Sequence, residues 1–168
     1  RNMANTAKII DGKAISASIR EQIKQDTKGF ITKTGVKPGL AVILVGEDPA
    51  SKIYVRNKKK ACEDVGFQSF EYLMPDETPE VVLKELIEKL NRDPAVHGIL
   101  CQLPLPKHID EKSVIETISP LKDVDAFHPI NVGRIMTGDY NFLPCTPAGI
   151  MEPVSYTHLR AHETLSDV

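Results

Sequence analysis

The sequence is short of cysteine and has no long apolar run. Its three cysteines, Cys62, Cys101 and Cys145, are odd in number and form no Cys-x-x-Cys pair. This argues against a disulfide framework and against a zinc ribbon, and it suits a reducing compartment. No apolar run approaches the roughly 20 residues of a membrane-spanning helix, and the N-terminus lacks the apolar core of a signal peptide. We therefore expect a cytoplasmic protein without a membrane segment.

An excess of either charge is also missing. The 168 residues include 21 Lys and Arg against 23 Asp and Glu, which gives a net charge of −2. Nothing in this balance indicates a nucleic-acid partner or an anionic membrane surface. With 41% hydrophobic and 26% charged residues, the composition is that of an ordinary globular protein, and the length is enough for one domain with a substantial core.

What the sequence does contain is an alternation of apolar runs and amphipathic patterns. Strands are predicted at 40–46, 67–74 and 96–103, after a short strand at 9–10. Helices are predicted at 13–33, at 49–65, from Pro79 to about residue 90, and after Asp110. This alternation is typical of an open α/β sheet whose mainly parallel strands are joined by right-handed crossovers.

Individual patterns give more detailed expectations. The continuous apolar run at 96–103 favours a central strand covered on both faces, and Thr78 is expected to cap the helix that begins at Pro79. Beyond residue 119 regular structure should thin out, with a structured loop at 122–129 and the start of another helix at 144–149. Buried stripes are expected on three helices, at Ile15, Ile19, Ile23, Phe30 and Ile31, then at Val82, Leu83, Leu86, Ile87 and Leu90, then at Val114, Ile115 and Ile118.

One stretch places two reactive side chains together. Asp48 and Pro49 favour a helix start directly after the first buried strand, and Gly66 favours its end. Residues four apart on a helix share a face, so Tyr54 and Lys58 should project side by side. Crevices at the carboxyl ends of parallel strands are where such folds bind ligands. The alternative is a ring packed on the core and an amine in solvent.

A third polar group is expected at the same crevice. Gln102 ends the third strand, and Pro104 and Pro106 stop the ladder just after it. Its amide can accept a hydrogen bond from an amine in either protonation state, so it suits a partner for Lys58. The alternative is a strand-end amide that caps a loop.

Four motifs in order resemble those of the bifunctional methylenetetrahydrofolate dehydrogenase/methenyltetrahydrofolate cyclohydrolase family. They are VGEDPASKIYVRNK at 45–58, QLPLP at 102–106, KDVD at 122–125 and PCTP at 144–147. The resemblance covers about residues 9–152. It implies a three-layer open sandwich with a mainly parallel sheet, the catalytic domain of that family.

The resemblance also implies roles for individual residues. Lys58 is implied as the general acid/base of both reactions, Tyr54 as the aromatic that packs against the pterin, and Gln102 as the amide that orients Lys58. The backbone at Cys101 and Leu103 is implied to shape the pocket. An amine that acts as a base must be neutral part of the time near pH 7, which partial burial and nearby cations favour.

Asp125 is implied as the carboxylate that accepts hydrogen bonds from the amino group and ring N–H of the pterin. Asp123 competes for that role, although it suits a loop-capping carboxylate better. Ala126 departs from the family, which usually has glycine at this position. If the position requires a positive φ, alanine costs roughly 1 kcal/mol there.

The reactions implied are oxidation of 5,10-methylenetetrahydrofolate to methenyltetrahydrofolate with NADP, then hydrolysis to 10-formyltetrahydrofolate. They belong to one-carbon metabolism and purine biosynthesis. The substrate is a small folate, NADP is the usual cofactor although the sequence does not distinguish it from NAD, and the family commonly forms homodimers, largely through its second domain.

That second, cofactor-binding Rossmann domain is not found in this sequence. No Gly-x-Gly-x-x-Gly turn occurs anywhere, and Pro153 interrupts the helix expected after the PCTP motif. We expect a disordered start at 1–8, the catalytic domain at 9–152, and a foreign, poorly ordered tail at 153–168. His158 and His162 have helical zinc-ligand spacing, but a third ligand is lacking and no metal is predicted.

This absence predicts that the chain has no NADP-dependent dehydrogenase activity and only weak folate binding or cyclohydrolase activity. Three alternatives remain open. The chain is a non-catalytic folate-binding fragment, or another oxidoreductase with a Tyr-x-x-x-Lys pair, such as a short-chain dehydrogenase, or a lyase that forms a Schiff base through Lys58. The single glycine at Gly46 disfavours the short-chain dehydrogenase, which places a glycine-rich turn before its tyrosine.

Overall fold

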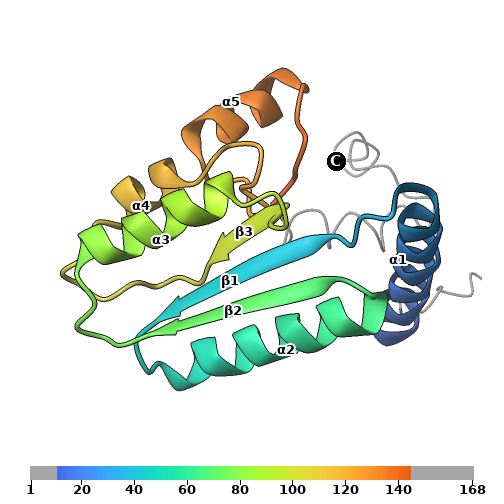
Figure 1. Ribbon diagram of the computed structural model, residues 1–168, viewed down its shortest axis with the longest axis horizontal. Coiled ribbons are helices and arrows are strands. Elements are labelled where there is room, and N and C mark those ends of the chain that lie inside the picture. Colours follow the sequence, from blue (N-terminus) through green and yellow to red (C-terminus); the bar gives the residue numbers. More distant parts are fainter. Residues whose placement is uncertain (1–10, 145–168) are drawn as a thin grey trace, which may run out of the picture.

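Among residues 11–144, the central sheet has three parallel strands in the order β2-β1-β3. A computed structural model describes residues 11–144 (Figure 1). The strands are β1 at Gly39–Val45, β2 at Gln68–Met74 and β3 at Gly98–Cys101. The helices of this range are α1 at Gly12–Thr34, α2 at Pro49–Val65, α3 at Glu80–Arg92, α4 at Glu111–Thr117 and α5 at Pro129–Thr137.

Side-chain alternation along β1 creates the layers, because successive residues of a strand point to opposite faces. Ala41, Ile43 and Val45 face a core built from α3 and α4, whose members include Leu83, Ile87, Leu90, Val114 and Ile118. Val42 and Leu44 face the other way and pack with Val55 of α2 and Leu100 of β3. The sheet thus lies between α2 on one side and α3 and α4 on the other (Figure 1). The predicted three-layer α/β fold is confirmed.

The expected position of the third strand was wrong. Among residues 11–144 the central strand is β1, and β3 pairs with only one strand. Its other side is covered by a single bridge to Asp123, where the Ile99 N–H donates to the Lys122 carbonyl at 2.7 Å. The predicted strand at 96–103 also extends beyond both ends of β3. The Gln102 N–H nevertheless still donates to the Ile43 carbonyl at 2.9 Å.

The predicted N-terminal helix is confirmed as α1, but its apolar stripe is not buried. Thr27 is its one buried residue, while Ile23 and Phe30 are 38% and 47% exposed. The helix lies at the end of the sheet where the strands begin, beside the last turn of α2 (Figure 1). Its amphipathic pattern therefore correctly predicted a helix and incorrectly predicted a covered face.

The predicted cap of α3 was also wrong. The Thr78 hydroxyl donates to the Pro75 carbonyl at 2.6 Å, and the N-cap position is taken by Pro79 without a side-chain hydrogen bond. The hydroxyl oxygen keeps lone pairs that could accept, but the helix begins one residue later than expected, so Thr78 lies before the N-cap position. In the predicted stripe, Leu83, Ile87 and Leu90 are buried, but Val82 is 43% exposed.

The last two helices differ in how well the sequence indicated them. Asp110 caps α4 as expected, accepting from the Lys112 and Ser113 amides, and Val114 and Ile118 are buried. Helix α5 was missed. Its one buried residue is polar, Asn131, whereas Ile130 and Met136 are 51% and 84% exposed, so its sequence has no inward apolar stripe.

Several expectations fall on residues outside the described range: the strand at 9–10, the PCTP motif beyond Pro144, the start and tail segments, and the His158–His162 pair. Within residues 11–144, no helix is both long and apolar enough to cross a bilayer.

Candidate active site

Helix α2 holds the predicted tyrosine and lysine at the boundary between core and solvent. The Asp48 carboxylate accepts from the Ser51 amide at 2.7 Å, which caps the helix, and Gly66 ends it with φ 90°. The buried edge of α2 consists of Ser51, Val55, Cys62 and Val65. Lys58 is half-buried beside this edge, and Tyr54, one turn earlier, is 59% exposed.

Lys58 and Gln102 meet as predicted. The Lys58 Nζ donates to Gln102 Oε1 at 3.0 Å, across 44 residues of sequence. The nitrogen of the same amide has a different partner, because Gln102 Nε2 donates to the Leu103 carbonyl at 2.8 Å. This second bond fixes which atom faces the amine. Alternation from Leu100 places Gln102 on the α2 side of the sheet.

Asp125 lies close enough to the pair for its charge to matter. Burial raises the pKa of the Asp125 carboxyl, the Lys58 ammonium opposes that rise, and Asp123 adds to it. Lys58 and Gln102 are therefore in contact at the end of β3, and Asp125 lies within range of the Lys58 charge. The ring of Tyr54 lies on the same helix face, open to solvent.

Cys101, predicted as a pocket residue, has a buried thiol. Burial, followed by the charges of Asp125 and Glu111, raises the pKa of that thiol to about 12. The thiol stays protonated near neutral pH, so it is not a nucleophile. Leu103, the other predicted backbone position, contributes its carbonyl to the Gln102 amide.

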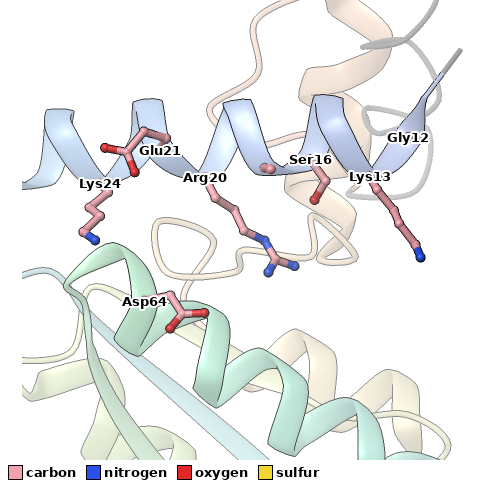
Figure 2. A pocket seen from close by; sticks show the side chains of 8 residues that line it. Gly12, Lys13, Ser16, Arg20, Glu21, Lys24 and Asp64 are labelled. Carbon is pink, nitrogen blue, oxygen red and sulfur yellow. The ribbon is translucent and has the colours of Figure 1, made fainter.

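A cavity of about 660 Å³ lies elsewhere, between α1 and α2. Figure 2 shows Arg20 and Lys24 projecting from α1 toward Asp64 of α2. No predicted site residue lines it. This cavity is an open groove between exposed charged side chains. The candidate active site is instead the place where Lys58 and Gln102 meet.

A sequence model described as the catalytic domain of tetrahydrofolate dehydrogenase/cyclohydrolase matches residues 10–125. The chain belongs to this family. The match includes Tyr54, Lys58, Gln102 and Asp125, and the resemblance inferred from the four motifs is confirmed.

Relatives and solved structures agree. The bifunctional protein FolD of Geotalea uraniireducens is 61% identical over 145 residues, covering 86% of this chain and 51% of that protein. The FolD protein of Acetivibrio thermocellus is 57% identical over 146 residues, covering 87% and 51%. The chain thus spans about half the length of the curated relatives it matches.

Among solved structures, the bifunctional FolD methylenetetrahydrofolate dehydrogenase/cyclohydrolase of Campylobacter jejuni has a TM-score of 0.87 at 46% identity, covering 90% of this chain and 54% of that one. The Trypanosoma brucei FolD, complexed with NADP cofactor and inhibitor, has a TM-score of 0.86 at 33% identity, covering 91% and 52%.

The departure at Ala126 has the predicted consequence for the backbone. Ala126 has φ 57°, the one positive φ of a non-glycine residue among those described, and its side chain is buried. The position directly after Asp125 is thus in the left-handed region that favours glycine.

The turn before α5 contains contacts that the sequence analysis only partly anticipated. Asp123 is 2% exposed and accepts hydrogen bonds from the His128 amide and the Asn131 side chain. A carboxylate so enclosed is structural, as its loop-capping interpretation expected. Asn131 itself was missed, because a single asparagine in a short helix gives no periodic signal.

The described residues do not fit the phosphates of a dinucleotide cofactor. The turn after β1 has one glycine, Gly46, and the Asp48 carboxylate already occupies the N-terminus of α2, where a pyrophosphate would need free N–H groups. The turn after β2 contains Asp76 and Glu77. Residues 11–144 also contain no cluster of three or more His, Cys, Asp or Glu side chains that could hold a metal ion.

Proposed function

We propose that this chain is the folate-binding, acid–base part of a bifunctional methylenetetrahydrofolate dehydrogenase/methenyltetrahydrofolate cyclohydrolase. The observation that carries the proposal is the 3.0 Å contact from Lys58 Nζ to Gln102 Oε1, beside a carboxyl whose pKa responds to the Lys58 charge. An amine, an amide and a carboxylate converge at the carboxyl end of a parallel strand, where α/β sheets bind ligands.

Each group has a distinct part in binding the pterin. Asp125 accepts hydrogen bonds from the 2-amino group and the adjacent ring N–H, a paired contact that charge strengthens. Tyr54 offers an exposed ring on which a flat pterin packs. The backbone around Cys101 and Leu103 forms the wall between them.

Lys58 moves the protons of the hydrolysis. Its neutral amine takes a proton from water as the water oxygen bonds to the methenyl carbon. The resulting ammonium protonates N5 as the bond from N5 to that carbon breaks, and the hydroxyl proton of the adduct passes to solvent. The products are 10-formyltetrahydrofolate and one proton. Gln102 holds the amine in place through both protonation states, since its oxygen accepts from either form.

The dehydrogenase reaction requires NADP, the cofactor with which the Trypanosoma brucei FolD is complexed. The described residues of this chain do not fit it, so we assign them no step of hydride transfer. We also propose, for the whole protein, a cytoplasmic homodimer that supplies one-carbon units for purine biosynthesis.

Binding and turnover measured together test the proposal. We expect folic acid to bind the purified chain, and methenyltetrahydrofolate to hydrolyse slowly above the rate in buffer. Binding without any turnover would support the fragment that only binds folate. A borohydride-trapped adduct between Lys58 and a carbonyl substrate would support the lyase instead, and failure to bind folic acid would contradict the proposal.

A further inference from the structure

The carboxylate of Asp123 is the centre of a buried hydrogen-bond network beside the candidate site. It is 2% exposed, and its Oδ2 accepts from the His128 amide at 2.8 Å and from Asn131 Nδ2 at 2.9 Å. Both donors belong to the start of α5. The network therefore joins the turn that carries Asp125 to the helix that follows it.

Asn131 joins the segment before this turn to the turn itself. Its Nδ2 also donates to the Pro120 carbonyl at 2.9 Å. One amide nitrogen thus bonds to a residue before the turn and to a residue within it. The side chain is 2% exposed, and its Oδ1 is buried with no hydrogen-bond donor among residues 11–144. The donated bonds of Nδ2 are therefore the contacts by which Asn131 holds the turn.

The backbone on either side of Asp125 is constrained as well. Before it, Val124 packs against β3 so closely that a Cβ at Gly98 would lie 2.6 Å from Val124 Cγ1. After it, Ala126 has φ 57°, and its N–H donates to the Asp123 carbonyl at 3.3 Å. A strained conformation of this kind persists only when its surroundings impose it.

We propose that Asp123 and Asn131 are positioning residues, which hold the turn in the conformation that aims Asp125 at the pterin edge. The inference rests on the proposed function, because it assigns Asp125 to the substrate. Buried polar networks are costly to form, and in some systems they specify geometry more than stability. Here the network surrounds the turn that carries Asp125, the side chain proposed to face the pterin.

A double-mutant cycle on folic acid binding tests the proposal. The variants are Asp125→Asn, Asn131→Leu and the double variant, each measured by calorimetry on the full 168-residue chain. Loss of a charge-assisted hydrogen bond should weaken binding by about tenfold or more. If Asn131 acts through Asp125, Asn131→Leu weakens binding similarly, and the double variant is no weaker than the weaker single variant.

A matched control separates positioning from folding. Asn91 also makes two side-chain bonds to backbone, to the Thr117 carbonyl and from the Ser119 amide, and lies on α3. We expect Asn91→Leu to lower the melting temperature while folic acid affinity stays within about twofold, since no ligand contact changes. If Asn131→Leu does not fold, Asp123→Asn replaces it in the cycle, because it keeps one accepting oxygen.

The outcomes are distinguishable. Losses that multiply in the double variant, or an unchanged affinity in Asn131→Leu, would overturn the positioning role and leave the proposed function intact. Normal binding in Asp125→Asn, or no binding by the unmodified chain, would remove the proposed function and this inference with it.

Discussion

At the scale of single residues, Asp125 combines a proposed substrate-binding role with an unfavourable environment. Burial raises the pKa of its carboxyl above the ordinary 3.8 despite the opposing Lys58 charge. The folded chain therefore holds this proton more tightly than the unfolded chain does. The free energy of unfolding therefore falls as the pH rises from about 3.8 through the raised native pKa, because the carboxyl ionises while it is buried.

Asp125→Asn should consequently be more stable than the unmodified chain near pH 7, with the advantage shrinking toward pH 3. Urea unfolding at about pH 3, 5 and 7, followed by circular dichroism, measures the difference. An advantage that is the same at all three pH values, or that grows in acid, would show that burial does not act on this carboxyl as described.

Ala126 allows a second residue-scale prediction. Its φ of 57° costs an L-residue about 1–2 kcal/mol, and a branched side chain in this buried position adds overpacking of about 1–3 kcal/mol. Because Ala126 already carries the cost of its positive φ, Ala126→Val should lower the free energy of unfolding by the added overpacking, about 1–3 kcal/mol.

The matched variant Ala126→Gly should stay within about 1 kcal/mol of the original. It relieves the left-handed strain but loses a buried methyl worth about 0.8 kcal/mol, and glycine is freer in the unfolded chain by about 0.5–1 kcal/mol. Chemical denaturation of both variants checks this ranking, and a Val variant as stable as the Gly variant would refute it.

The sequence predicted the residues of the site that regular geometry determines. Tyr54 and Lys58 share a face because they are four apart on a helix, and Gln102 faces α2 because it continues a strand. The Asn131 contact depends on how a turn folds back between two elements. Neither the helical nor the strand periodicity of the sequence therefore predicts it. Ala126 was anticipated only because the family resemblance indicated glycine there.

At the scale of elements, the contact of β3 with the 122–125 segment positions the site. A Cβ added at Gly98 would lie 2.6 Å from Val124 Cγ1 and 3.2 Å from Leu40 Cδ1. We expect Gly98→Ala to cost about 1–3 kcal/mol. It should also weaken folic acid binding, because Val124 adjoins Asp125.

The rescue variant is Gly98→Ala combined with Val124→Ala. Removing the Val124 methyls relieves the nearest clash, so the two substitutions should be less destabilising together than the sum of their separate effects. Thermal unfolding of the three variants measures this coupling. Strictly additive losses would mean that the strand and the turn do not press on one another.

Helices were predicted well where a buried apolar stripe exists and poorly where it does not. α3 and α4 have such stripes and were found. α5 was missed because the residue it buries is Asn131, while Ile130, Val132 and Met136 are exposed. α1 shows the reverse case, since a periodic pattern forms the helix although its apolar residues remain partly exposed. The pattern indicates helical structure, and only the tertiary fold determines what covers it.

At the scale of the whole molecule, the described residues contain the proposed folate site but no place for the cofactor's phosphates. Asp48 occupies the N-terminus of α2, and the turn after β2 is acidic. We expect the purified 168-residue chain to form no NADPH from methylenetetrahydrofolate and NADP, as followed by NADPH absorbance. Folic acid binding by the same preparation shows that the chain is folded. Robust NADPH formation would refute this prediction.

The rate of methenyltetrahydrofolate hydrolysis tests most directly whether the amine of Lys58 performs the proton transfers. The comparison uses the unmodified chain, Lys58→Met, and Lys52→Met, an exposed lysine of the same helix. General acid–base catalysis contributes about 10²–10⁴-fold, so Lys58→Met should fall to the rate in buffer while folic acid binding and melting temperature persist. Lys52→Met should match the unmodified chain. Hydrolysis by Lys58→Met at the unmodified rate would contradict the account.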